Sequence, residues 1–106
     1  MTILVVHCEL NRSDTKSLKT RESVFKKEVS KGRRSEQISS NGSTFFVQTP
    51  ESALILLKRL IENCILNKEK DRLSITDAGQ GKVYIWGRFD EEISTKFPFL
   101  IEEYGA

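Results

Sequence analysis

Residues 43–68, STFFVQTPESALILLKRLIENCILNK, decide the fold. The first seven are rich in β-branched and aromatic side chains and predict a short strand. Thr49, Pro50 and Glu51 then suit the start of a helix as cap, first helical residue and acidic partner of the helix dipole. Eight apolar residues follow on one wide face: Ala53, Leu54, Leu56, Leu57, Leu60, Ile61, Cys64 and Ile65. This spacing predicts an amphipathic helix from Pro50 to about Lys68.

Strand patterns lie on both sides of this helix. Thr2–Cys8 contains four consecutive aliphatic residues, which is typical of a strand that is buried on both faces. Arg72–Thr76 and Lys82–Phe89 each alternate apolar and polar residues, and the turn between them contains two glycines, so they predict a hairpin. Asp90 is the expected N-cap of a C-terminal helix that Pro98 breaks or kinks.

The front third of the chain has a weaker pattern. Arg21–Lys31 consists mostly of good helix formers, and Gly32 is a suitable helix terminator. The alternative is a pair of strands over residues 23–30 and 35–39. We prefer the helix. Ser35–Ser43 is rich in serine, asparagine and glycine and predicts a loop.

The expected fold is therefore one α/β domain over residues 1–106, with a basic segment at 11–43 that could be mobile. It has a mixed four-stranded sheet, two to three helices and the element order β(α)βαββα. Thioredoxin-type α/β sandwiches share this order, but the Cys-x-x-Cys motif of that redox family is absent. The likeness is one of topology only.

Composition excludes several classes of protein. Hydrophobic residues make up 38% and charged residues 30% of the 106 positions, as in a polar globular protein. No apolar run approaches the roughly 18 residues of a membrane span, and the first ten residues lack the features of a secretory signal. Cys8 and Cys64 are too few for a disulfide framework, so we expect unpaired thiols and a cytoplasmic setting.

The sequence contains few groups that could carry catalysis. With one histidine and two cysteines, a metal site is not expected, and no cofactor motif is present. His7 and Cys8 are neighbours on a predicted strand, so their side chains point to opposite faces. Asp77–Lys82 lacks the first glycine of a phosphate-binding loop, and a hairpin turn explains its two glycines. An enzyme is therefore less expected than a binding protein.

The charges are distributed unevenly, although the net charge is only +2. Between Asn11 and Arg34, nine basic residues stand against three acidic ones, a net charge of +6. The last 18 residues carry five acidic residues and Lys96, a net charge of −4. A basic segment attracts phosphate groups, whereas the acidic end could neutralise it within one molecule or between two copies.

The alternating run Lys82-x-Tyr84-x-Trp86-x-Arg88 would place two aromatic rings and two cations on one strand face. On an open sheet face, such rings can stack on bases while cations hold phosphates. If a helix covers this face, both rings belong to the core. Together with the basic segment, this run gives the predicted nucleic-acid-binding residues Lys26, Lys27, Lys31, Arg33, Arg34, Tyr84, Trp86 and Arg88.

The function that we expect is that of a small, non-enzymatic, cytoplasmic regulatory or accessory protein. Its partner would be RNA or DNA, contacted through the basic segment. The alternative is an inhibitor or immunity-type protein that binds another protein through its charge-polarised surface. Neither hypothesis involves a membrane, a metal or a cofactor, and a homodimer is compatible with both.

Overall fold

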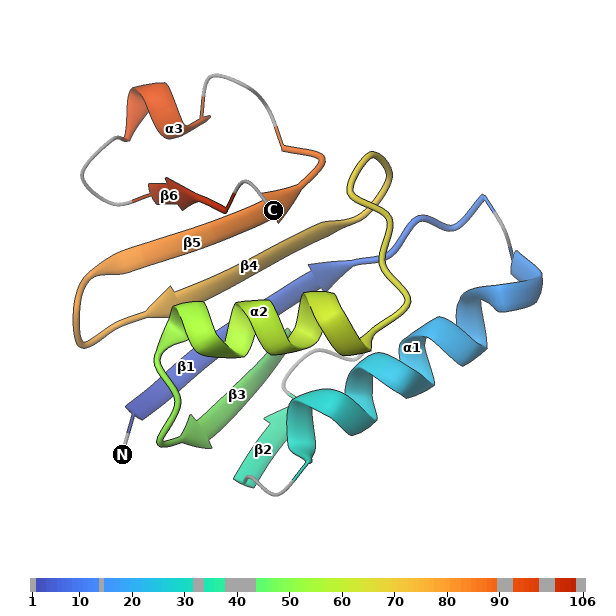
Figure 1. Cartoon of the computed structure of the whole chain (residues 1–106), viewed down its shortest axis with the longest axis horizontal. Coiled ribbons are helices and arrows are strands. Elements are labelled where there is room, and N and C mark those ends of the chain that lie inside the picture. The colour runs from blue at the N-terminus through green and yellow to red at the C-terminus, as the bar shows by residue number, and fades with distance from the viewer. Residues whose placement is uncertain are drawn as a thin grey trace.

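The computed structural model describes residues 2–13, 15–31, 34–37, 44–89, 93–97 and 101–104 (Figure 1). These residues form six strands: β1 Thr2–Glu9, β2 Arg34–Gln37, β3 Thr44–Thr49, β4 Arg72–Asp77, β5 Lys82–Gly87 and β6 Ile101–Glu103. They also form three helices: α1 Thr15–Ser30, α2 Ala53–Asn63 and the short α3 Ile93–Lys96. The protein is thus a mixed α/β structure with two long helices.

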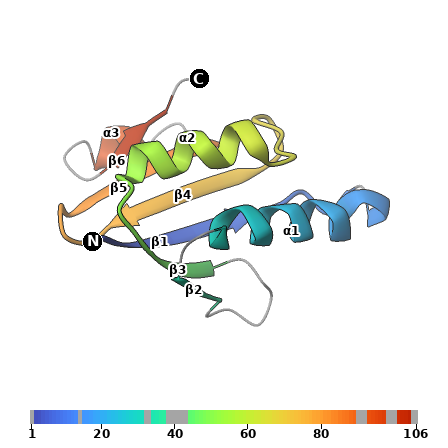
Figure 2. The ribbon, with the colours of Figure 1, turned by 60° about the horizontal axis from the view of Figure 1, so that its bottom comes forward.

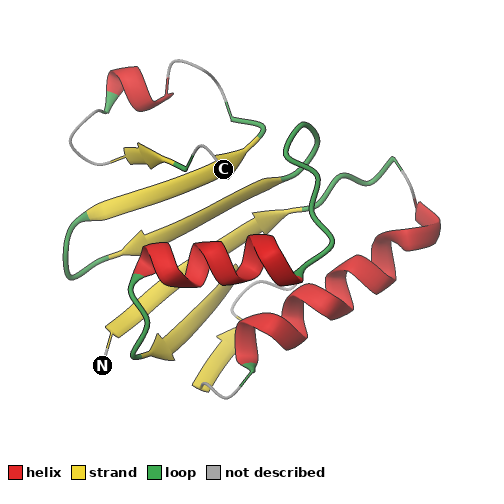
Figure 3. Cartoon of the chain, in the orientation of Figure 1, coloured by secondary structure: helices red, strands yellow, loops and turns green. Residues whose placement is uncertain are grey.

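The six strands form one sheet in the order β2-β3-β1-β4-β5-β6. Neighbouring strands are antiparallel except β5 and β6, which are parallel. The units β1-α1-β2 and β3-α2-β4 each cross over one intervening strand, which is the split β-α-β or ferredoxin-like arrangement. Such crossovers are almost always right-handed, and two of them in this order bring both helices to the same face (Figures 2 and 3).

The core lies between this face of the sheet and the two long helices. Alternate residues of β1, β3 and β4 point into it, and Phe25 of α1 packs on Phe45 of β3 with their ring centroids 5.9 Å apart. Leu56, Leu57 and Leu60 of α2 are completely buried, as predicted, whereas Leu54 and Ile65, predicted on the same face, are 46% and 52% exposed. The core cluster contains Leu4, Val6, Cys8, Phe25, Val29, Phe45, Val47, Ala53, Leu56, Leu57, Leu60, Leu73, Ile75 and Trp86.

α2 is shorter than predicted at both ends. Its N-cap is Ser52, whose hydroxyl accepts the N–H of Ile55 at 3.2 Å. Thr49, the predicted cap, belongs to β3 and its hydroxyl accepts the N–H of Glu51 instead. At the other end, the helix finishes at Asn63 because the chain must turn back into β4.

The predicted four-stranded sheet and its element order are wrong, because the sheet also contains β2 and β6. Both are short strands at the edges. β2 overlaps the predicted loop Ser35–Ser43 and also the second strand, over residues 35–39, of the alternative interpretation. β6 lies where the C-terminal helix was expected. Their pairing with β3 and β5 creates them, since neither has the apolar alternation of a strand. Of the predicted C-terminal helix, only Ile93–Lys96 is helical among the described residues, and Asp90 and Pro98 lie outside them.

The helix predicted in the front third of the chain is confirmed, but it is longer than predicted. α1 begins at Thr15, six residues before the predicted start, and the alternative pair of strands is wrong for residues 23–30. Because α1 and α2 cover the same face, the layering also differs from a thioredoxin-type sandwich, which has helices on both faces. No helix among the described residues has both the length and the apolar character needed to cross a membrane.

Candidate functional site

α1 directs a row of lysines away from the core. Arg21, Phe25 and Val29 form its buried side, and its outer side carries four exposed lysines: Lys16, Lys19, Lys26 and Lys27. At 100° per residue, Lys16 and Lys27 project in nearly the same direction, about 16 Å apart along the axis. None of the four forms an ion pair with another described residue. The outer face of α1 is therefore strongly basic.

The acidic residues of α1 offset little of this charge. Glu22 is exposed, but Glu28 turns toward α2, where its carboxylate lies 3.2 Å from Nη1 of Arg59. Arg59 also binds Glu51 with two parallel contacts, at 2.9 and 3.1 Å. This largely buried network joins α1 to the start of α2 and removes one acidic side chain from the outer face.

Arg21, counted in the basic segment, has a structural role. The residue is only 9% exposed, and its Nη2 donates to the carbonyl of Asn11 at 2.8 Å. Nε donates to the hydroxyl of Ser17 at 3.0 Å, and Nη1 lies 3.9 Å from the buried carboxylate of Asp71. Arg21 thus fixes the start of α1 to the rest of the fold.

The predicted basic residues have different positions. Lys26 and Lys27 are exposed on the outer face of α1, and Lys31 is exposed directly after the helix. Arg33 lies outside the described residues. Arg34 is the first residue of β2, and its side chain is outside the described part of the structure. Lys16 and Lys19 were missing from the predicted site because the helix was expected to begin only at Arg21.

The predicted aromatic platform is wrong. In the β4–β5 register, Tyr84 lies opposite Ile75 and Trp86 opposite Leu73, so both rings point to the helix-covered face. Trp86 is 5% exposed within the core cluster, and Tyr84 packs partly buried against it. Since α2 packs over β4 and β5, no open face remains there for bases to stack on. The alternation in the sequence is real, but it marks core residues.

Arg88 belongs neither to the outer face of α1 nor to the buried aromatic pair Tyr84 and Trp86. It lies just after β5 and lines a small polar pocket with Arg12, Lys70 and Arg72. No sequence pattern predicts this grouping, because the four residues meet only through the pairing of β1, β4 and β5.

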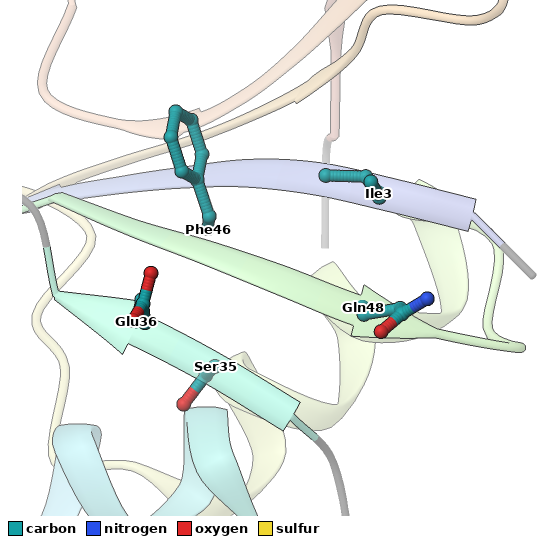
Figure 4. Close-up of a pocket in the computed structure, with 5 residues that line it drawn as sticks. All are labelled: Ile3, Ser35, Glu36, Phe46 and Gln48. Carbon is teal, nitrogen blue, oxygen red and sulfur yellow. The ribbon is translucent and has the colours of Figure 1, made fainter.

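In the described part of the chain, no helix lies over β1 and β3 on the other face of the sheet. Ile3 and Phe46 are exposed there, at 58% and 44%. Together with Ser35, Glu36 and Gln48 they line a shallow depression of about 360 Å³ (Figure 4). It is a mainly apolar surface on the side opposite α1 and α2.

Both thiols lie in environments that favour their protonated form. Burial is the main cause that raises the pKa of the Cys64 thiol to about 12, with a further contribution from the Glu28 carboxylate. Burial, followed by the nearby Asp71 carboxylate, raises the pKa of Cys8 even further above its usual range. Within the described residues, no three His, Cys, Asp or Glu side chains are grouped closely enough to hold a metal ion.

Comparison with known proteins gives no match. No protein-family model, no curated protein and no solved structure matches this chain.

Proposed function

We propose that this protein is a non-enzymatic binding protein that contacts nucleic acid through the outer face of α1. One observation carries the proposal: Lys16, Lys19, Lys26 and Lys27 are all exposed on one side of a helix, and Glu22 is the single exposed acid of that helix. Lys31 extends the same basic surface at its C-terminal end.

The arrangement suits recognition of a phosphate backbone. Duplex DNA carries about one charge per 1.7 Å of its axis, so a stripe of lysines about 16 Å long can follow several phosphates at once. Lysine ammonium groups act as mobile point charges and contact phosphate without reading the bases. Binding of this kind depends little on sequence and strongly on salt.

The test is a fluorescence anisotropy titration with labelled single-stranded RNA, single-stranded DNA and duplex DNA over a series of salt concentrations. The variant is Lys26→Gln/Lys27→Gln. Its matched control is Lys58→Gln/Lys68→Gln, which removes the same charge from α2 and the following turn, where both lysines are exposed. The α1 variant should weaken binding and lower the salt slope by up to about 0.9 per lost duplex phosphate contact. The control should bind like the wild type.

Two results would contradict the proposal. If the wild type has no affinity for any of the three nucleic acids at low salt, the function is wrong. If both double variants weaken binding equally, the effect is one of net charge and the outer face of α1 is not the site.

A protein partner is the second candidate, and a different surface favours it. Ile3 and Phe46 expose apolar area on the helix-free face of the sheet, and large exposed apolar patches mark interaction sites. In the charge-polarised surface of the sequence-based alternative, Glu102 of the acidic end forms an ion pair with Lys82. Apolar binding would persist at high salt and be lost in Phe46→Ser, which separates it from phosphate binding.

A further inference from the structure

A second basic site lies at the end of the sheet where β1 and β5 finish and β4 begins. It is a polar pocket of about 250 Å³. Four cations and one carboxylate line it: Arg12, Lys70, Arg72, Arg88 and Glu9. They come from three segments of the chain, residues 9–12, 70–72 and 88, so the fold, and not a local run of basic sequence, brings them together.

Asp71 organises this pocket from beneath. Its carboxylate is 1% exposed and accepts two backbone N–H groups, from Asn11 and Asn67, both at 2.7 Å. Its own carbonyl accepts the N–H of Arg88 at 2.8 Å. In Figure 3, the loop from α2 to β4 accordingly lies beside the end of β1.

Every cation of the pocket lies next to, or takes part in, one of the backbone hydrogen bonds made by Asp71. Arg12 follows Asn11 in sequence, and Lys70 and Arg72 flank Asp71 on either side. Arg88 is itself bonded to Asp71, and the chain comes so close there that a Cβ atom on Gly87 would lie 2.1 Å from the carbonyl oxygen of Asp71. Gly87 has a φ of +105°, a conformation that glycine permits. The backbone beneath the four cations is therefore fixed.

The charges within the pocket are not balanced. Glu9 is the single carboxylate among the described residues of its lining, and it is shared between Arg72, 3.7 Å away, and His7, 3.3 Å away. Within the described residues, Arg12, Lys70 and Arg88 have no carboxylate partner. Cations held together on a fixed backbone repel one another, and an anion placed between them removes this repulsion.

We propose that this pocket binds a phosphate group. Arginine guanidinium groups form paired hydrogen bonds to phosphate oxygens, and the pocket contains three of them. Its volume is below the roughly 300–1,000 Å³ of sites that enclose a whole small molecule. It therefore holds one phosphate while the remainder of the ligand lies outside. The proposal does not depend on whether the outer face of α1 binds nucleic acid.

Calorimetric titration with inorganic phosphate at low ionic strength tests the site directly. The wild type should give saturable binding, and Arg12→Gln/Arg88→Gln should weaken it by about tenfold or more. Lys58→Gln/Lys68→Gln is the control of equal charge and should bind phosphate like the wild type. Lys26→Gln/Lys27→Gln should also retain phosphate binding, which separates this site from the outer face of α1.

The source of the phosphate is then identified by competition with oligonucleotides that carry a 5′-phosphate or a 5′-hydroxyl. Displacement by the 5′-phosphate form alone assigns the pocket to a terminal phosphate, and equal displacement assigns it to a phosphodiester. Absence of displacement assigns it to a small free phosphate. The proposal is overturned if the wild type shows no saturable phosphate binding, or if the pocket variant, with an unchanged circular dichroism spectrum, binds phosphate as tightly as the control.

Discussion

At the scale of single residues, Asp71 connects four segments of the chain. It bonds the end of β1, the turn before β4, the residue after β5 and, through Arg21, the start of α1. Nothing in the sequence marks it, because it is one acidic residue within the charged run Lys68–Arg72. Its partners are 4 to 60 positions away and meet it only in the fold.

Replacing Asp71 with alanine should destabilise the protein by about 3 kcal/mol, because two backbone N–H groups would lose their acceptor and the buried Arg21 guanidinium would lose a nearby carboxylate. Urea unfolding, followed by circular dichroism, measures this change. Glu69→Ala is the control, since Glu69 is exposed in the same turn. A midpoint for the Asp71 variant equal to that of the control would show that this carboxylate does not hold the segments together.

The two thiols should be unreactive in the folded protein at pH 8, since their raised pKa values keep them protonated. Labelling with a disulfide reagent should be slow in buffer and fast in urea. Above about pH 8.5, the unfolded chain loses its thiol protons while the folded chain keeps them. The free energy of unfolding should therefore decrease as the pH rises toward 12. Rapid labelling of the native protein would contradict this account.

At the scale of elements, the segments with strong apolar periodicity were predicted correctly. The short edge strands were not, because their pairing with neighbouring strands defines them. The apolar spacing of Leu56, Leu57 and Leu60 was enough to place α2, and the alternation around Ile75 and Ile85 was enough to place the hairpin. β2 and β6 have too few residues to show a period, so only their neighbours define them. For the candidate site, Lys26 and Lys27 were predicted, but periodicity alone could not tell that α2 covers Tyr84 and Trp86.

Leu57→Ala and Leu60→Ala should each lower the free energy of unfolding by roughly 2–5 kcal/mol, as expected for completely buried leucines. Leu54→Ala is the matched control in the same helix, because Leu54 is exposed and should change stability by about 0.5 kcal/mol or less. Chemical denaturation of the three variants gives the comparison. Equal effects at all three positions would mean that α2 presents a different face to the sheet.

At the scale of the whole molecule, the protein presents three distinct surfaces. The outer face of α1 is basic, the end of the sheet carries the arginine-lined pocket, and the helix-free face of the sheet is apolar around Ile3 and Phe46. One consequence of the split β-α-β topology is that α1 and the helix-free face lie on opposite sides of the sheet (Figure 2). A ligand bound to one of them leaves the other accessible.

The most direct measurement of the central claim is therefore a two-dimensional ¹H–¹⁵N NMR titration of the labelled protein with an unphosphorylated single-stranded oligonucleotide at low salt. Binding through the outer face of α1 should shift mainly the amides of Thr15–Lys31 and leave those of Ile3 and Phe46 unchanged, and these shifts should disappear as salt is raised. Shifts confined to Ile3, Phe46 and their neighbours, or a spectrum that the oligonucleotide does not change, would contradict it.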